Sequence, residues 1–311
     1  MMRGAVILGM LLWALVVTAQ DYERIDATIL LYPQRVDTPQ ELSRFITRDF
    51  TTDEEKVRAI YSWIIQNIAY EPDEYKQFNF TFKNYRERNE KEEKTREKII
   101  ERTLQKGIAV CEGYAMLFEK LCELQGIPNY LVRGDIKTNF NDIGRPFAKT
   151  HMWNVVTLDG KPYLFDPTWG AGRYNGKFIK EPSYFYYKTP PHLFFKTHYP
   201  DMYEDAFMDQ LISKDVFSQM PIIIKEELSM SDVEQPLSGL IYSEAYFDVV
   251  PFTIANVNPK TVTYSYGSEK KSVRNLEKSG NRLQFSVPLE IGAENLLIYF
   301  DDQPALGYKI K

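Results

Sequence analysis

The chain has 311 residues and a formal net charge of -5. This acidic balance argues against a general nucleic-acid or anionic-membrane surface. The sequence contains no Cys/His zinc spacing, no glycine-rich phosphate loop and no calcium loop of the twelve-residue type. We therefore expect no cofactor and no metal, with an irregular calcium site left open.

Residues 1–19 have the pattern of a secretory signal peptide. Arg3 gives a positive start, the apolar stretch Ala5–Val17 is too short to span a bilayer comfortably, and Val17-Thr-Ala19 offers small residues before a cut near Gln20. No later segment has the length of uninterrupted apolar residues that a membrane span needs. We expect an exported protein, periplasmic or extracellular, with no stable membrane span after cleavage.

Two helices are predicted next, followed by a long charged segment. Thr38-Pro-Gln-Glu41 and Thr52-Asp-Glu-Glu55 have the spacing of capping boxes, and a helical apolar stripe follows the second of them. Residues 83–106 are dominated by Arg, Glu and Lys. We interpret 83–106 as a charged helical insertion, a solvated helix or loop, with a lid over the substrate groove as the alternative.

Cys111 is predicted to lie in the first turn of a buried helix. Apolar residues recur at helical spacing as far as about Gln125, and Gly126 and Pro128 then end the helix. Backbone N–H groups and the helix dipole at such a position favour a thiolate and can form half of an oxyanion hole. The same helix places Cys122 too far away for a disulfide, at about 1.5 Å of rise per residue.

A β-hairpin is predicted around Asp159-Gly160, a strong two-residue turn signal. In that register Trp153 faces Asp166, so His151, Trp153 and Asp166 share one face of the hairpin. His151 and Asp166 become diagonal neighbours that long side chains can bridge. A carboxylate there would orient the imidazole towards the thiol, so Cys111, His151 and Asp166 are the candidate catalytic residues.

The other two histidines, His192 and His198, lie in an aromatic, proline-rich segment without such a companion, and we expect them to be structural. From about Ser218 short apolar and β-branched runs alternate with turn residues, which predicts a small β-sandwich of the immunoglobulin-like kind. The fold class is therefore α+β, with helices on an antiparallel sheet in residues 20–217 and a sandwich in 218–311.

Several motifs, taken together, resemble the transglutaminase-like superfamily, a branch of the papain-like cysteine enzymes, and in particular its kyphoscoliosis-peptidase-like branch. The resemblance covers roughly 52–212. Its motifs are Val57-Arg-Ala-Ile-Tyr-Ser-Trp63, Cys111-Glu-Gly-Tyr, His151-Met-Trp-Asn, Asp166-Pro-Thr-Trp-Gly, Tyr184-Phe-Tyr-Tyr-Lys-Thr-Pro190 and His198-Tyr-Pro.

The resemblance implies a papain/transglutaminase-like core in which Cys111 is the nucleophile, His151 the general base and acid, and Asp166 the orienting residue. Members attack amide carbonyls through a thioester, and they hydrolyse peptides, cross-link glutamine to lysine or cleave other amides. Some have lost catalysis and serve as binding modules, so membership alone does not fix the reaction.

We therefore expect an exported thiol enzyme that acts on amide bonds of a peptide or protein substrate. Hydrolysis is favoured, because nothing in the sequence marks a dedicated amine site. The alternatives are a protein-glutamine transglutaminase and a non-catalytic binding or scaffold protein that retains the fold. Trp153, Trp169 and Tyr114 are expected to line the substrate site.

Overall fold

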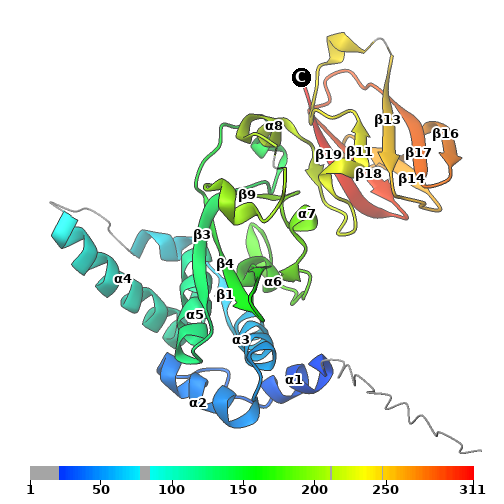
Figure 1. The fold of residues 1–311 in the computed structure, drawn as a ribbon. Helices are drawn as coiled ribbons and strands as arrows, with labels where there is room; N and C mark the ends of the chain where they lie inside the picture. The colour runs from blue at the N-terminus through cyan, green and yellow to red at the C-terminus, as the bar shows by residue number, and fades with distance from the viewer. Residues whose placement is uncertain (1–20, 78–84, 211, 247) are drawn as a thin grey trace, which may run out of the picture.

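The computed structural model describes residues 21–77, 85–210, 212–246 and 248–311, and it shows an N-terminal lobe of helices around a sheet and a C-terminal lobe of strands (Figure 1). Within these residues, none of the helices combines the length and the apolar character needed to cross a bilayer. The expected signal peptide, residues 1–19, lies outside the described residues.

Helix α5 is central to the N-terminal lobe and packs against α2, α3, α4 and strand β4. The helices are α1 Tyr22–Ile29, α2 Pro39–Asp49, α3 Asp53–Asn67, α4 Tyr85–Lys106, α5 Cys111–Leu124, α6 Pro167–Gly170, α7 Pro191–Phe194 and α8 Lys214–Gln219.

The two predicted caps are present, in different forms. Thr52 and Glu55 form the complete reciprocal capping box at the start of α3. At the start of α2 the Thr38 side chain accepts from the backbone of Glu41, but the Glu41 carboxylate accepts from Asp37 instead of Thr38. Each arrangement satisfies otherwise unpaired N–H groups and fixes where the helix begins.

A five-stranded antiparallel sheet, ordered β8-β5-β4-β3-β9, lies beside these helices. Its strands are β3 Asn129–Ile136, β4 His151–Leu158, β5 Lys161–Phe165, β8 Tyr187–Thr189 and β9 His198–Pro200. Two small pairs complete the lobe, β1 Ala69–Tyr70 with β2 Ile108–Ala109, and β6 Gly172–Asn175 with β7 Lys177–Lys180. The α+β prediction, helices on an antiparallel sheet, is confirmed.

The predicted hairpin joins β4 to β5 in the predicted register. Asn154 lies opposite Phe165, and both Asp159 and Gly160 have positive φ, at 50° and 74°. Positive φ at both central residues is typical of the turn that matches the strand twist. When this register is continued by one residue, Trp153 lies opposite Asp166.

Both faces of the sheet are buried. Met152 and Val156 of β4 pack with the helices, whereas Trp153 and Val155 belong to a second apolar cluster with Phe194 on the other face. The alternation of side chains along a strand explains this division. His151 shares the parity of Trp153, which places its imidazole on the side of the second cluster.

The C-terminal lobe is a β-sandwich of two sheets that share one core. One sheet has the order β11-β13-β17-β16, and the other β10-β19-β18-β14-β15 with β12 also paired to β19. The strands are β10 Ile222–Ile223, β11 Val233–Gln235, β12 Leu240–Ile241, β13 Val249–Ala255, β14 Val262–Ser265, β15 Lys271–Ser272, β16 Arg274–Ser279, β17 Arg282–Pro288, β18 Asn295–Phe300 and β19 Gln303–Ile310.

Two buried lysines hold the segment that leads into the sandwich. Lys137 Nζ donates to the Met220 carbonyl at 2.7 Å, and Lys196 Nζ donates to the carbonyls of Lys225 and Glu226 at 2.7 Å each. Strand β10 already pairs with β19 of the sandwich. The predicted domain boundary, between residues 217 and 218, falls inside α8 and before β10.

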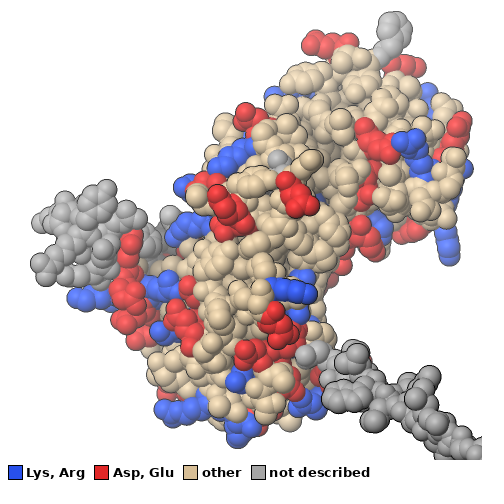
Figure 2. Space-filling model, viewed as in Figure 1, with Lys and Arg blue, Asp and Glu red and all other residues tan. Residues whose placement is uncertain are grey.

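The described part of the charged insertion is helical, since α4 runs to Lys106 just ahead of Cys111. Ile99, Ile100 and Leu104 form its buried stripe, and Arg102 pairs with Glu74. Figure 2 shows acidic and basic side chains interspersed over the visible face. Residues 83 and 84 of the insertion lie outside the described part, and its interpretation as a lid stays a prediction.

Candidate active site

Cys111 is the first residue of α5, as the sequence predicts. Gly107 precedes it with φ 65°, the left-handed conformation that closes α4 and turns the chain towards α5. Val110 is the N-cap and offers no side-chain hydrogen bond, so the first-turn N–H groups are not capped by it. Both cysteines are free and buried, which agrees with the expectation that no disulfide joins them.

The thiol of Cys111 lies against the start of β4. The backbone N–H of Met152, the residue directly after His151, lies near its sulfur and acts to lower its pKa. The thiol also donates to the Glu112 carboxylate, with 3.2 Å between Sγ and Oε2. The helix start and the strand start thus bring the nucleophile and the imidazole-bearing end of β4 together.

The electrostatic environment of the resting thiol differs from the sequence-based expectation. Burial first, then the charge and hydrogen bond of Glu112, raise the pKa of Cys111 well above its ordinary value. The expected preference for a thiolate at the helix start is therefore outweighed in the resting state. A neutral thiol needs a base at the moment of attack, and the imidazole of His151 is the candidate for it.

His151 and Asp166 form the predicted pair. His151 Nε2 lies 2.7 Å from Asp166 Oδ2, and both side chains are buried. Because an ionised carboxylate only accepts, Nε2 carries a proton, and in the neutral imidazole Nδ1 then holds the lone pair. That lone pair is what a base for the thiol proton requires.

Asp166 is held as an anion by four donors. It is the N-cap of α6, where its Oδ1 accepts from the backbone N–H groups of Thr168 at 2.8 Å and Trp169 at 3.1 Å. Its Oδ2 accepts from His151 and also from His198 Nε2 at 3.0 Å. Burial would raise the pKa of Asp166, but the two histidines outweigh it and hold that pKa far below its ordinary value.

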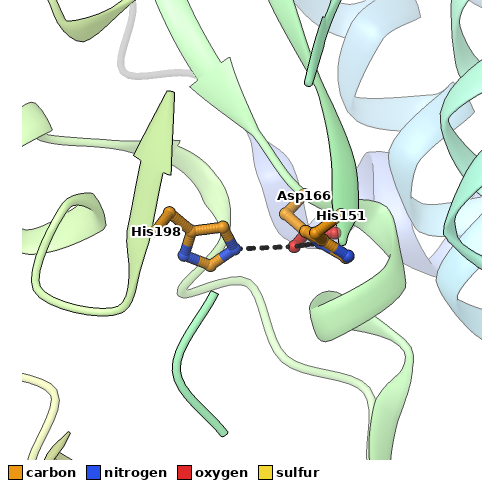
Figure 3. A group of neighbouring side chains, drawn as sticks. All are labelled: His151, Asp166 and His198. Atoms are coloured by element: carbon orange, nitrogen blue, oxygen red, sulfur yellow. Dashed lines mark hydrogen bonds and ion pairs between the residues drawn. The ribbon is translucent and has the colours of Figure 1, made fainter. Parts of the chain in front are cut away.

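His198 corrects the expectation that this residue has no functional companion. It lies on β9, and it shares the carboxylate oxygen with His151 (Figure 3). The local pattern around His198 carries no sign of this contact, because pairing of β9 with β3 is long-range. The one signal was the His198-Tyr-Pro motif in the family resemblance. His192 is exposed on α7, and the expectation that it is structural stays a prediction.

The three expected substrate-lining residues have different environments. Tyr114 is fully buried, and its hydroxyl donates to the Ile68 carbonyl at 2.8 Å, so the expectation of substrate contact is wrong for this residue. Trp153 is also fully buried, so the expectation of substrate contact is wrong for this residue as well. Its ring centroid lies 6.2 Å from that of His151, and it supports the imidazole from the core. Trp169 is partly exposed and lies 6.3 Å from His151 by ring centroids, which leaves it able to contact a substrate.

His151, Asp166 and His198 also have the composition of a metal site, since their ligand atoms lie within 4.8 Å of one another. Hydrogen bonding accounts for this geometry. Both Nε2 atoms point to one oxygen of Asp166, at 2.7 and 3.0 Å, which are ordinary distances for N–H···O hydrogen bonds. The arrangement is that of a carboxylate orienting imidazoles.

Comparisons with known proteins agree with these features. Residues 40–167 match the family model of the transglutaminase-like superfamily. Human kyphoscoliosis peptidase is 32% identical over 190 residues, which are 58% of this chain and 26% of that protein. The mouse kyphoscoliosis peptidase is 32% identical over 170 residues, 52% of this chain and 23% of that protein. The chain thus spans about a quarter of the length of the curated relatives it matches.

Solved structures show more distant similarity. A crystal structure of a TGase is 14% identical with a TM-score of 0.30, over 57% of this chain and 40% of that chain. An arylamine N-acetyltransferase from Bacillus cereus, with a Cys-His-Glu triad, is 16% identical with a TM-score of 0.27, over 49% and 51%. Residues 40–167 therefore form a domain of the transglutaminase-like superfamily, and part of the chain is similar to the kyphoscoliosis peptidases.

Proposed function

We propose that the chain is an exported cysteine hydrolase that cleaves amide bonds in peptides or proteins, with Cys111, His151 and Asp166 as its triad. The observation that carries this proposal is the buried 2.7 Å contact between His151 Nε2 and Asp166 Oδ2, beside a thiol that touches the next residue of the same strand. A structural core has no need for this combination of groups at a helix start.

Acylation begins with the neutral thiol. His151 Nδ1 takes the proton from Cys111 Sγ as the sulfur attacks the amide carbon, and the imidazolium is stabilised by Asp166. The carbonyl oxygen becomes an oxyanion, and the backbone N–H of Cys111 is a donor for it at the helix start. Collapse of this intermediate breaks the C–N bond, and His151 returns the proton to the leaving amine, which leaves a thioester on Cys111.

Deacylation repeats the same steps with water. His151 takes a proton from the water molecule that attacks the thioester carbon, and the acid product and the free thiol are released. A lysine amine in place of water would form a new amide, which is the transglutaminase alternative. Hydrolysis is favoured because nothing in the sequence marks a dedicated amine site.

A second candidate function is a non-catalytic binding protein that retains the fold. One observation favours it, namely that Cys111 is only 6% exposed and its thiol is bonded to Glu112 in the resting state. An enzyme with this resting state must move Glu112 away before attack, whereas a binding protein need not. The two functions therefore differ in whether any effect depends on the sulfur.

The test compares the wild type with Cys111→Ala and His151→Ala on a fluorogenic peptide library, with and without a labelled primary amine. Cleavage by the wild type alone supports the hydrolase. Incorporation of the amine in place of cleavage supports the transglutaminase. Equal results for wild type and Cys111→Ala, with both folded, would sink the enzyme proposal. Cys122→Ala is the matched control, because Cys122 is the second free, buried cysteine on the same helix.

Export and the kind of sandwich are further parts of the proposal. Export rests on the signal-peptide pattern of residues 1–19, and N-terminal sequencing of protein recovered outside the cell tests it. An immunoglobulin-like sandwich is supported by the strand order, since β11-β13-β17-β16 against β19-β18-β14-β15 corresponds to the A-B-E-D and G-F-C order of that fold.

A further inference from the structure

Two imidazoles share one oxygen of Asp166. His151 Nε2 lies 2.7 Å and His198 Nε2 3.0 Å from Oδ2, and all three residues are buried (Figure 3). A triad of thiol, imidazole and carboxylate needs only the first of these bonds. The second bond therefore requires its own explanation.

The sheet holds both imidazoles through the strand between them. His198 lies opposite Ile136 of β3, and His151 lies opposite Gly134 of the same strand. Gly134 permits the close packing at this point, because a Cβ there would lie 2.1 Å from the Tyr199 carbonyl oxygen and 2.4 Å from Trp153. The position of His198 relative to the triad is thus fixed by backbone pairing and not by its own rotamer alone.

The protonation state of His198 is fixed by its partners. Thr197 Oγ1 lies 2.9 Å from Nδ1, while Nε2 faces a carboxylate that only accepts. Nε2 must therefore carry the hydrogen, and Nδ1 accepts from the threonine hydroxyl. Burial also lowers the pKa of His198 despite its bond to Asp166, which keeps the ring neutral.

Aromatic rings leave His198 no freedom to turn. Phe194 stacks on its ring at 4.2 Å between centroids, and Trp169 lies at 4.6 Å. Trp169 also donates its backbone N–H to Asp166 Oδ1. The ring that packs on His198 and the N–H that holds the other carboxylate oxygen therefore come from one residue.

We propose that His198 is a positioning residue of the active site, which holds the Asp166 carboxylate in the orientation that His151 requires. The backbone N–H groups at the start of α6 hold Oδ1 of Asp166. The bond from His198 to Oδ2 then prevents the carboxylate from rotating about its bond to Cβ. Its donor also makes Oδ2 less basic, so the proton taken from the thiol stays on His151, from which it can be returned to the leaving amine. This inference rests on the proposed triad.

The first experiment measures the state of His198 directly by long-range ¹H–¹⁵N spectra of its ring. The chain has three histidines, so each imidazole can be assigned with single variants. The proposal expects a neutral ring with hydrogen on Nε2 at pH 7 to 8, since burial lowers the pKa of His198. A ring that carries hydrogen on Nδ1, or that titrates near its ordinary pKa of about 6.5, overturns it.

The second experiment measures alkylation of Cys111 by iodoacetamide against pH in the wild type, His198→Phe, His198→Gln and His151→Ala, with the Cys111 peptide quantified by mass spectrometry. His198→Phe should slow alkylation at pH 7 roughly tenfold, less than the full effect of losing a positioned base. His198→Gln supplies a donor near the position of Nε2 and should recover most of the rate. His192→Phe is the control from the same segment and should leave the rate unchanged.

The outcomes separate the two proposals. If His151→Ala slows alkylation but His198→Phe does not, the positioning role is wrong and the triad stands. If His151→Ala has no effect, the proposed function fails, and the ring spectra alone decide the contact of His198 with Asp166. Equal loss in His198→Phe and His198→Gln, with both variants folded, indicates a packing role and also overturns the inference.

Discussion

The Cys111 thiol donates to the carboxylate of its neighbour Glu112, with 3.2 Å between Sγ and Oε2. The other oxygen of Glu112 lies 3.8 Å from the Arg133 guanidinium on β3, and the Arg133 side chain is 52% exposed. Glu112 thus lies between the nucleophile and a cation at the surface. An anion so placed stabilises the protonated thiol and opposes the thiolate, which the chemistry has to overcome.

Glu112→Gln should lower the pKa of Cys111, because it removes the negative charge and replaces a carboxylate acceptor with a weaker amide oxygen. We expect faster alkylation of Cys111 between pH 7 and 9, with the rate rising at a lower pH than in the wild type. Mass spectrometry of the Cys111 peptide measures this. Glu123→Gln, an exposed change on the same helix, is the control. An unchanged or slower rate in Glu112→Gln would show that Glu112 does not suppress the thiol.

The sequence predicted the parts of the site that depend on local pattern. The Asp159-Gly160 turn determined the register of β4 and β5 and hence the meeting of His151 and Asp166. The glycine and apolar spacing placed Cys111 at the start of α5. These predictions succeed because a two-residue turn and a helix start each restrict the backbone over a few neighbouring residues.

The remaining features depend on contacts that no local pattern contains. His198 reaches Asp166 through pairing of β9 with β3, two strands that are far apart in the chain. Tyr114 is near Cys111 in sequence, but it points to the Ile68 carbonyl on the core side of α5. Strand β16 cannot be predicted from an apolar stripe, because all of its residues are exposed. It is a sheet edge, where polar residues are usual.

Asp166→Asn should abolish most of the reactivity of Cys111 while it retains the cap of α6. The amide oxygen can still accept from Thr168 and Trp169, but the NH₂ group then faces two imidazole N–H donors. His151 must change tautomer or turn away, and a comparable change in a serine triad costs about 10⁴ in rate. We expect a loss of at least about 10² in Cys111 alkylation or turnover at pH 7.

Asp135→Asn is the matched control for Asp166→Asn. Asp135 is a buried carboxylate on the same sheet, with Arg145, Ala148 and Thr150 as its partners. Its replacement should cost stability, about 1–3 kcal/mol for a lost partner of a buried group, without a specific effect on Cys111. Thermal unfolding and alkylation are measured on both variants. Equal losses of alkylation rate in the two would mean that Asp166 acts only through stability.

Gly134→Ala should destabilise the N-terminal lobe, because its Cβ would lie within 2.1 Å of the Tyr199 carbonyl oxygen. That contact is with backbone and cannot be relieved by a side-chain movement, so β9 must shift away from β3. Overpacking of this kind costs about 1–3 kcal/mol. Chemical denaturation measures the change, and Gly267→Ala, where a Cβ meets only open space, should be near neutral. A stable Gly134→Ala with normal Cys111 reactivity would contradict the tight pairing.

Lys137 gives stability a dependence on pH. Burial lowers the pKa of Lys137 to about 7 in the folded chain, against 10.5 for an ordinary lysine, while Nζ donates to the Met220 carbonyl at 2.7 Å. Between these two values the unfolded chain binds a proton that the folded chain does not, so the contribution of Lys137 to stability increases as pH rises. Below about pH 7 both states are charged and the cost of burying the charge is fully present.

Lys137→Met removes the cost of burying a charged lysine. The variant should therefore be most stable relative to wild type at low pH. We expect its free energy of unfolding relative to wild type to fall from pH 6.5 to 9, by at most about 1.4 kcal/mol per pH unit. The loss of the bond to Met220 lowers the variant equally at each pH and does not change the slope. Urea unfolding at several pH values measures it, with Lys149→Met, a lysine whose side chain is 57% exposed, as the control. If the difference in free energy of unfolding between Lys137→Met and wild type does not change with pH, Lys137 stays charged in the folded chain.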